Sequence, residues 1–230
     1  MTVSSSYNFE QNREELIKDA LANLGALGPD GTPSGAQTIH AGRALNRVVK
    51  SIDPEGQFLW RVVRRTFNTT SGTATATPAA DVISIDEPMS YLPAASGSTR
   101  TVLHAMSRHE YMILPDRTTA GKPTRFFFER TMTTNTVTMY PVPDTTGDTV
   151  EYSAILKSRD LDEAADTPDF PAQWNACLVY GLTSELAPVY GATDVQLQMF
   201  RQVFMEEKNK LLSAETEHGR VILVPFGGSW

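Results

Sequence analysis

The pattern of apolar and polar positions divides the chain into two helical stretches that flank one β-like stretch. Near the N-terminus, apolar residues from Leu16 to Leu24 recur at three- and four-residue steps, which is the spacing of a helix with one buried face. Asn8 and Gln11 match a capping box before these residues, and Gly25 is placed to end the helix. The spacing therefore predicts a first helix from Asn8 to Leu24.

A second helix is predicted after the glycine- and proline-rich loop at residues 28–33. Ser34 is a suitable N-cap, with Gln37 three residues later, and the apolar positions that follow keep the helical spacing. The small pair Ala41 and Gly42 would let a neighbouring helix approach closely. Two helices joined by a short loop suggest an αα-hairpin.

Two further helices are predicted in the last third of the chain. Asp169 and Pro171 are placed to open the third helix, because proline is favoured in the first helical turn. The fourth helix is expected to begin at Thr193 or Asp194 and to continue to Leu212, with large apolar residues on one side. Both ends of the chain are therefore predicted to be helical.

The middle third, from Gln57 to Leu156, changes to runs of β-branched and aromatic residues separated by Pro, Gly, Asn and Asp. This pattern is typical of strands and their turns. The candidate strands are Phe58–Val63, Val82–Ile85, Glu110–Leu114, Arg125–Glu129, Val137–Pro141 and Val150–Leu156. Residues 69–80 and 94–101 lack bulky side chains and are expected to be mobile loops or linkers. Alternation should bury one or two rings of the run Phe126–Phe128.

These elements predict an α+β protein with three parts. Residues 1–56 and 168–215 are expected to form a four-helix bundle. Residues 57–160 are expected to form an inserted antiparallel β-sandwich or barrel-like domain, and residues 216–230 an extended C-terminal arm. No repeat of about 20 to 50 residues is visible, so a solenoid or propeller is not expected.

The predicted arm contains an apolar run, which is a liability in a chain end unless another surface covers it. Two outcomes are open: the run packs on the chain's own core, or it docks on a partner subunit as an added strand or anchor. The candidate contact residues are Val221, Ile222, Leu223, Val224, Pro225, Phe226 and Trp230.

Composition excludes several classes of protein. The 230 residues are 40% hydrophobic and 20% charged, as in ordinary globular proteins. A net charge of −7 argues against a protein that mainly neutralises phosphates. The one cysteine, Cys177, cannot form an intramolecular disulfide, and neither a signal-like start nor a membrane-spanning run is visible. We therefore expect synthesis in the cytoplasm and no contact with a membrane.

The sequence matches no known metal or cofactor pattern, and no cofactor is expected. The four histidines, which have no metal-ligand spacing, are His40, His104, His109 and His218. The densest group of carboxylates consists of Asp160, Asp162, Glu163, Asp166 and Asp169. It lacks the glycine and terminal glutamate of an EF-hand, so a solvated, capping connector is favoured over cation binding at subunit contacts.

Catalytic motifs are also missing, and the chain is not expected to be an enzyme. The sequence contains no G-x-S-x-G, Walker A or G-x-G-x-x-G motif. A glycosidase would need two carboxylates facing each other in a cleft. The possible members, none of them in a motif, are Glu14, Glu15, Asp53, Glu55, Glu129 and Glu151. The arginines Arg61, Arg64 and Arg65 could pair with a neighbouring subunit or meet phosphate, and both interpretations stay open.

Three segments resemble a known family. They are Ala44–Asn46 in the second helix, Gly56–Trp60, and above all Asp169–Trp174 followed by Leu178–Leu182. The last reads Asp-Phe-Pro-Ala-Gln-Trp and leads into an apolar helix with a Tyr-Gly pair. This pattern, which extends over most of the chain, is similar to podovirus tail tubular protein A and related head-to-tail adaptors. None of its residues is catalytic.

The resemblance implies a structural subunit of a tailed phage, located in the virion at the head–tail junction and made in the host cytoplasm. It implies a ring of about twelve copies beneath the portal protein, with the tail nozzle or tube protein on the other face. DNA would pass through the lumen without specific binding, and Val221 to Trp230 would engage the portal or a neighbouring subunit. The alternatives are a peptidoglycan-hydrolysing tail accessory enzyme and a tail completion or fibre-attachment protein.

Overall fold

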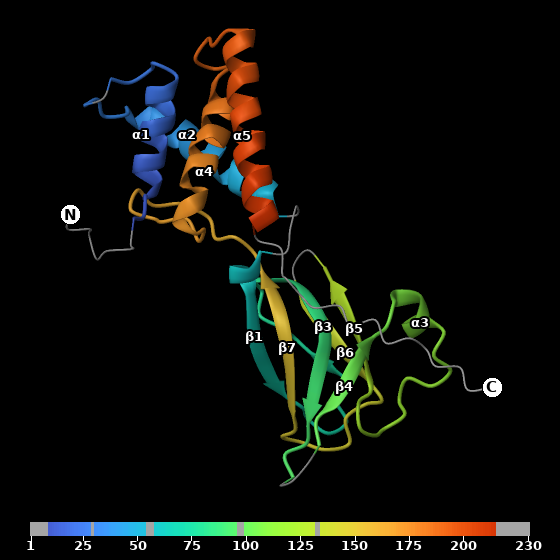
Figure 1. Cartoon of the computed structure of the whole chain (residues 1–230). Coiled ribbons are helices and arrows are strands. Elements are labelled where there is room, and N and C mark those ends of the chain that lie inside the picture. The colour runs from blue at the N-terminus through green and yellow to red at the C-terminus, as the bar shows by residue number, and fades with distance from the viewer. Residues whose placement is uncertain (1–8, 29, 54–57, 96–98, 132–133, 215–230) are drawn as a thin grey trace, which may run out of the picture. The chain divides into compact units, whose positions relative to one another are not determined.

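The computed structural model describes residues 9–28, 30–53, 58–95, 99–131 and 134–214, and the chain divides into two compact units (Figure 1). The helical unit comprises Met1–Leu59 and Arg159–Trp230, and the β unit comprises Trp60–Ser158. The α+β class is confirmed, with five α-helices and one curled, half-barrel-like sheet in the described residues.

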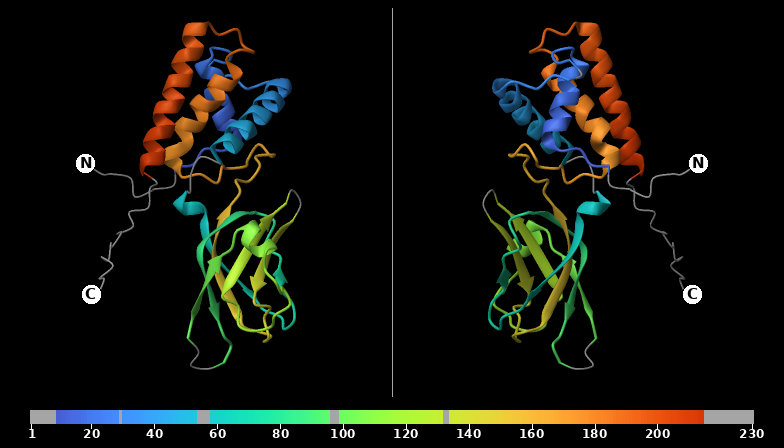
Figure 2. Two further views of the ribbon diagram at one scale, coloured as in Figure 1. Left: turned by 90° about the vertical axis from the view of Figure 1, so that its right-hand side faces the viewer. Right: turned by 90° about the vertical axis from the view of Figure 1, so that its left-hand side faces the viewer.

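The helical unit contains four of the α-helices and a short 3₁₀ turn (Figure 2). They are α1 (Arg13–Asn23), α2 (Gly35–Ile52), η3 (Ala172–Trp174), α4 (Asn175–Leu186) and α5 (Asp194–Ala214). Helix α4 packs against α1, α2 and α5, and α5 also contacts η3. The completely buried positions of α4, which include Leu178, Leu182 and Leu186, form the centre of this unit.

The first helix begins later than predicted. Its capping box is formed by Asn12 and Glu15: the Glu15 amide donates to Asn12 Oδ1 and the Asn12 amide to Glu15 Oε2, each at 2.9 Å. The prediction of Asn8 and Gln11 was wrong, and Asn8 lies outside the described residues. Both pairs have the same spacing, but Asn12 directly precedes the buried face of the helix, while Gln11 donates to Asp19 instead.

The second helix is capped by Ser34 and Gln37, as predicted. The small pair in this helix has a different role from the one expected, because the guanidinium of Arg13 from α1 covers Gly42. Side chains of two other helices pack closely against Gly181 of α4. A Cβ atom there would lie 2.8 Å from Val48 of α2 and 2.9 Å from Phe204 of α5.

Within the part of the β unit that the structure describes, seven strands form one sheet. They are β1 (Val62–Asn68), β2 (Thr75–Ala76), β3 (Val82–Leu92), β4 (Thr101–Ala105), β5 (Arg125–Arg130), β6 (Asn135–Tyr140) and β7 (Thr149–Leu156). Their order is β1-β7-β3-β4-β5-β6-β2. The pairing is antiparallel except between β4 and β5, which are parallel, so the sheet is mixed and not antiparallel throughout.

Three predictions for the β region were wrong. The expected strand Glu110–Leu114 is part of helix α3 (Arg108–Met112), because Ser107 and Glu110 form a capping box that starts a helix there. The first strand begins at Val62, after the 3₁₀ turn η2 (Leu59–Arg61). The expected loop at 69–80 contains the short strand β2, which is held by its pairing with β6.

The core of the β unit is one cluster of buried side chains from strands β3 to β7. Its buried residues are Val82, Met89, Tyr91, Leu103, Phe126, Val137, Met139, Val150, Tyr152 and Ala154. Phe126 and Phe127 are both buried, which confirms that the phenylalanine run serves packing. The candidate strand Val150–Leu156 is confirmed as part of β7, in which Val150, Tyr152 and Ala154 alternate with less buried residues and belong to the core.

Candidate interaction sites

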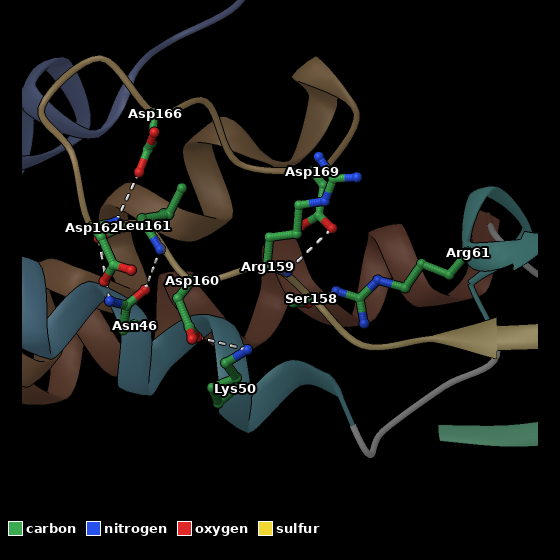
Figure 3. A network of polar contacts seen from close by, with 10 residues as sticks. All are labelled: Asn46, Lys50, Arg61, Ser158, Arg159, Asp160, Leu161, Asp162, Asp166 and Asp169. Carbon is green, nitrogen blue, oxygen red and sulfur yellow. Dashed lines mark hydrogen bonds and ion pairs between the residues drawn. The ribbon is translucent and has the colours of Figure 1, made fainter. Parts of the chain in front are cut away.

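Hydrogen bonds within the acidic segment Arg159–Asp169 and an ion pair with α2 hold this segment in place. The amides of Asp162 and Glu163 both donate to Asp166 Oδ2, at 2.8 and 2.7 Å (Figure 3). Asp160 pairs with Lys50 of α2 at 2.9 Å. These contacts agree with the predicted capping connector. Across the described part of the chain, no group of three or more His, Cys, Asp or Glu residues is placed to hold a metal ion.

The same segment is anchored to α2 by one amide side chain. Asn46 Oδ1 accepts the Leu161 amide at 2.9 Å, and Asn46 Nδ2 donates to the Leu161 carbonyl at 3.3 Å (Figure 3). The leucine side chain is buried, so its backbone polar groups need these partners. Asn46 belongs to one of the segments that carry the family resemblance, and its role here is structural.

The helix start that carries the strongest resemblance forms an aromatic cluster. Trp174 is completely buried, with its ring centroid 5.2 Å from Phe58 and 5.6 Å from Phe170. The first pair is T-shaped, which is a favourable arrangement of aromatic rings. Phe58, Phe170 and Trp174 thus join three distant parts of the sequence, and the motif stabilises the fold of the helical unit.

The arginines proposed as a basic patch have partners within the β unit. Arg61 is buried and donates to Ser158, while Arg65 pairs with Asp81 at 2.6 Å. Glu151 lies between Arg64 and Arg100. The hydrogen bond from Arg64, together with the charge of Arg100, lowers the pKa of Glu151. These partners within the chain account for the three arginines, so neither a phosphate nor a neighbouring subunit is needed to explain their positions.

Tyr91 and Asp148 form the buried polar pair of the β unit. The Tyr91 hydroxyl donates to Asp148 Oδ2, and the Ala94 amide donates to Oδ1 at 2.7 Å. Burial, reinforced by the hydrogen bond to Asp148, raises the pKa of Tyr91 to about 12. Burial acts to raise the pKa of Asp148 too, but the hydrogen bonds from Tyr91 and Ala94 outweigh it and lower the pKa. Both groups keep their ordinary charge states at neutral pH.

Three of the carboxylates considered for catalysis have other partners in the described structure. Glu15 caps α1, Glu129 pairs with Arg108 at 2.8 Å, and Glu151 is held by two arginines. Glu55 and His218 lie outside the described residues. Of the histidines, His40 is on α2, His104 on β4 and His109 on α3, and all three are exposed.

Helix α3 presents a rigid aromatic stack that the sequence analysis did not identify. Tyr111 stacks on Phe127 at 5.2 Å, and the guanidinium of Arg117 lies 4.9 Å from the centre of the Tyr111 ring. Beyond this stack, Met112 and Ile113 are 60% and 63% exposed. The capping pattern at Ser107 was the signal that could have revealed the helix.

Helix α5 also exposes large apolar side chains. Val195 and Met199 are one turn apart and 76% and 52% exposed, and Met205 is also exposed. Apolar side chains gathered on one helix face are typical of surfaces that another protein covers. The predicted contact residues Val221, Ile222, Leu223, Val224, Pro225, Phe226 and Trp230 lie outside the described residues.

A groove of about 450 Å³ lies within the helical unit, beside the first turn of α4. Its walls are formed by Phe9, Gln11, Asp19, Ala22, Asn23, Ala172, Gln173, Asn175, Ala176, Val179 and Tyr180. A smaller hollow of about 90 Å³ adjoins it and shares Gln11, Ala172 and Asn175. Asn175 is only 7% exposed, and its Nδ2 has no hydrogen-bond partner among the described residues.

Apolar faces on α3 and α5, combined with carboxylates engaged in capping and ion pairs, are typical of a subunit that acts by assembly. A comparison with known protein families supports this interpretation. Residues 12–223 match the model of the SU10 adaptor protein family, and the chain therefore belongs to that family of phage head-to-tail adaptors. This match confirms the predicted relationship.

Membership makes the chain a phage structural protein and a virion component, and it implies association with portal and tail proteins. No curated protein matches the chain. Within the described residues, no helix combines the length and hydropathy required to span a bilayer.

Proposed function

We propose that this chain is the subunit of a ring of about twelve copies that joins the portal protein to the tail nozzle or tube protein. The observation that carries the proposal is the family match over residues 12–223, which includes most of the helical unit and the complete β unit. For this ring we propose that α1, α2, α4 and α5 act as a four-helix bundle and that the curled sheet acts as the inserted domain. The role is structural and not enzymatic.

Exposed apolar side chains in both units support assembly through more than one surface. A closed ring needs two different faces on each subunit, one for each neighbour. Val195 and Met199 on α5 and Met112 and Ile113 on α3 are candidate contact residues for these faces. Because hydrophobic burial stabilises subunit contacts by about 25 cal/mol per Å², even modest faces matter when repeated around a ring.

The net charge of −7 supports passage of DNA without specific binding. Affinity for DNA depends mainly on lysine and arginine side chains that neutralise phosphates. Two of the candidate arginines, Arg64 and Arg65, are paired with carboxylates, as is Arg100. An acidic protein that repels phosphates would let DNA slide through the lumen.

The residues Val221 to Phe226 and Trp230 remain our predicted contacts with the portal or with a neighbouring subunit. An apolar segment of this kind suits a hydrophobic groove or an open strand edge on a partner.

Mixing the purified chain with portal rings, followed by negative-stain imaging, tests the proposal. We expect a ring of about twelve subunits on one face of the portal. Trimers or hexamers would instead favour a tail completion or fibre-attachment protein, and no binding to the portal would overturn the proposal. Release of soluble fragments from peptidoglycan, lost when Glu129 or Glu151 is replaced by glutamine, would support the enzyme alternative.

A further inference from the structure

The groove beside the first turn of α4 has the features of a binding site for an extended peptide. Ala22, Ala172 and Ala176 contribute small side chains to its walls, which leaves room for bulky apolar groups. Phe9 is 70% exposed and lines the groove together with Tyr180. Small residues with aromatic neighbours form the kind of surface on which Val, Ile, Leu or Phe side chains can be buried.

Polar atoms in the groove match a peptide backbone better than an anion or a hydrocarbon. Asn175 Nδ2 is a buried donor without a partner in the described structure, which costs free energy until an acceptor is supplied. Asp19 also lines the groove and provides an acceptor, with one oxygen bound to Gln11 at 2.8 Å. An extended peptide supplies both a carbonyl and an amide. A free anion would be repelled by Asp19.

The chain itself contains a segment with this chemistry. Residues 221–226 read Val-Ile-Leu-Val-Pro-Phe and carry six consecutive apolar side chains. Residues 1–8 also adjoin the groove in sequence, through Phe9, but they include three successive serines and have far less apolar surface to bury. The apolar segment is therefore the better match.

The end of α5 places this segment within reach. Helix α5 contacts η3, whose residues Ala172 and Gln173 line the groove. Helices α4 and α5 run in opposite directions, so α5 ends near the start of α4 (Figure 1). The link of residues 215–220 spans at most about 20 Å, roughly twice the diameter of a helix. A short link also gives a millimolar effective concentration, which favours the same chain over a second copy.

We propose that the Val221–Phe226 segment docks into the groove of its own chain before assembly. The contact gives Asn175 an acceptor and covers the apolar segment, which protects the free subunit from aggregation. Release of the segment then makes it available to the portal or a neighbouring subunit. The role in assembly depends on the proposed function, but the contact within the free chain does not.

Disulfide trapping in the full chain without portal tests the contact directly. In the variant Asn23→Cys/Val224→Cys, one cysteine lies in the groove wall and the other in the segment. The matched control is Glu14→Cys/Val224→Cys, because Glu14 is exposed on the same helix but does not line the groove. The native Cys177 is buried and is left in place.

We expect the first variant to form an intramolecular disulfide at least about tenfold faster than the control, measured on non-reducing gels and by intact mass. Equal rates would overturn the proposal. A disulfide-linked dimer in place of the intramolecular product would also overturn it, and would identify a second copy as the occupant.

Replacing the unpartnered donor provides an independent check. Asn175→Ala, made in the Asn23→Cys/Val224→Cys background, should slow trapping several-fold, because it removes the donor that the docked segment satisfies. Unchanged trapping would contradict the role of Asn175. These measurements need no portal, so their failure is distinguishable from failure to form the ring.

Discussion

The two units stabilise their structures by different means. In the helical unit, the uncharged side chain of Asn46 anchors the connector through hydrogen bonds to the Leu161 backbone, and aromatic rings pack around Trp174. In the β unit, charged groups are paired across the sheet, as in Glu151 with Arg64 and Arg100, and a buried carboxylate accepts from Tyr91. The difference teaches that neutral packing joins distant segments of the helical unit, whose ion pair Lys50–Asp160 is exposed, while the β unit also holds the carboxylate of Asp148 in its interior.

The two units also differ in how well their helices and strands can be predicted from the sequence. Apolar periodicity within one helix is local, and it located all four helices of the helical unit. Strand pairing brings together residues far apart, such as β1 and β7, and it depends on partners that no short window contains. This is why the errors are concentrated in the β unit.

The largest effect is expected for Trp174→Ala. Loss of this completely buried ring and its contacts with Phe58 and Phe170 should destabilise the helical unit by about 3–5 kcal/mol. The β unit should keep its structure. Urea unfolding followed by NMR signals from methyl groups of each unit would show separate transitions, whereas a single shifted transition would contradict the independence of the units. Gln173→Ala, at an exposed neighbour, is the control.

A smaller effect, limited to the β unit and dependent on pH, is expected for Asp148→Asn. Loss of the charged acceptor of Tyr91 and Ala94 should cost about 2 kcal/mol at pH 7. Because the native pKa of Asp148 is lowered, its stabilisation is present above the unfolded-state pKa of about 4 and is lost as the pH falls through the native pKa.

Melting temperatures of the wild type and Asp148→Asn should therefore differ by a constant amount above about pH 5 and converge in more acidic buffer. A difference that grows on acidification would refute this assignment. Trp174→Ala, which removes no titratable group, should show no such convergence.

The change Asn46→Ala should have an effect of about 1–2 kcal/mol on the helical unit, because it leaves the Leu161 amide and carbonyl without their partner. Asn46→Asp keeps the acceptor for the amide but loses the donor, and it should fall between alanine and the wild type. Hydrogen exchange of the Leu161 amide measures this directly. Exchange at the wild-type rate in Asn46→Ala would show that the contact does not protect the connector.

The smallest effect on stability is expected for Met199→Ser on the exposed face of α5. The side chain is 52% exposed, so unfolding free energy should change by no more than about 0.5 kcal/mol. Assembly with portal rings should nevertheless weaken, which light scattering or imaging can detect. If Met199→Ser forms rings as well as a serine substitution of an exposed residue elsewhere, such as Ala36→Ser, the α5 face is not a subunit contact.

Local sequence patterns predicted a structural feature correctly where neighbouring residues alone determine that feature. The cap at Ser34 and the 3₁₀ turn after Pro171 follow from neighbouring residues, and the burial of Phe126 in the sheet core follows from alternation along one strand. The segment Asp169–Trp174 also carried enough information to indicate the adaptor family, which the match over residues 12–223 confirmed.

The tertiary structure decided what distant residues do to each other. The sequence indicated Asn8 and Gln11 as the cap of the first helix, whereas the structure forms the capping box at Asn12 and Glu15, directly before the buried face. The arginines Arg61, Arg64 and Arg65 formed an unexplained patch until Ser158, Glu151 and Asp81 proved to be their partners. Sequence alone determined the four helices of the helical unit and the family, because both depend on local order. The groove, the ion pairs and the strand order could be seen only in the tertiary structure, because the residues that form them are far apart in the sequence.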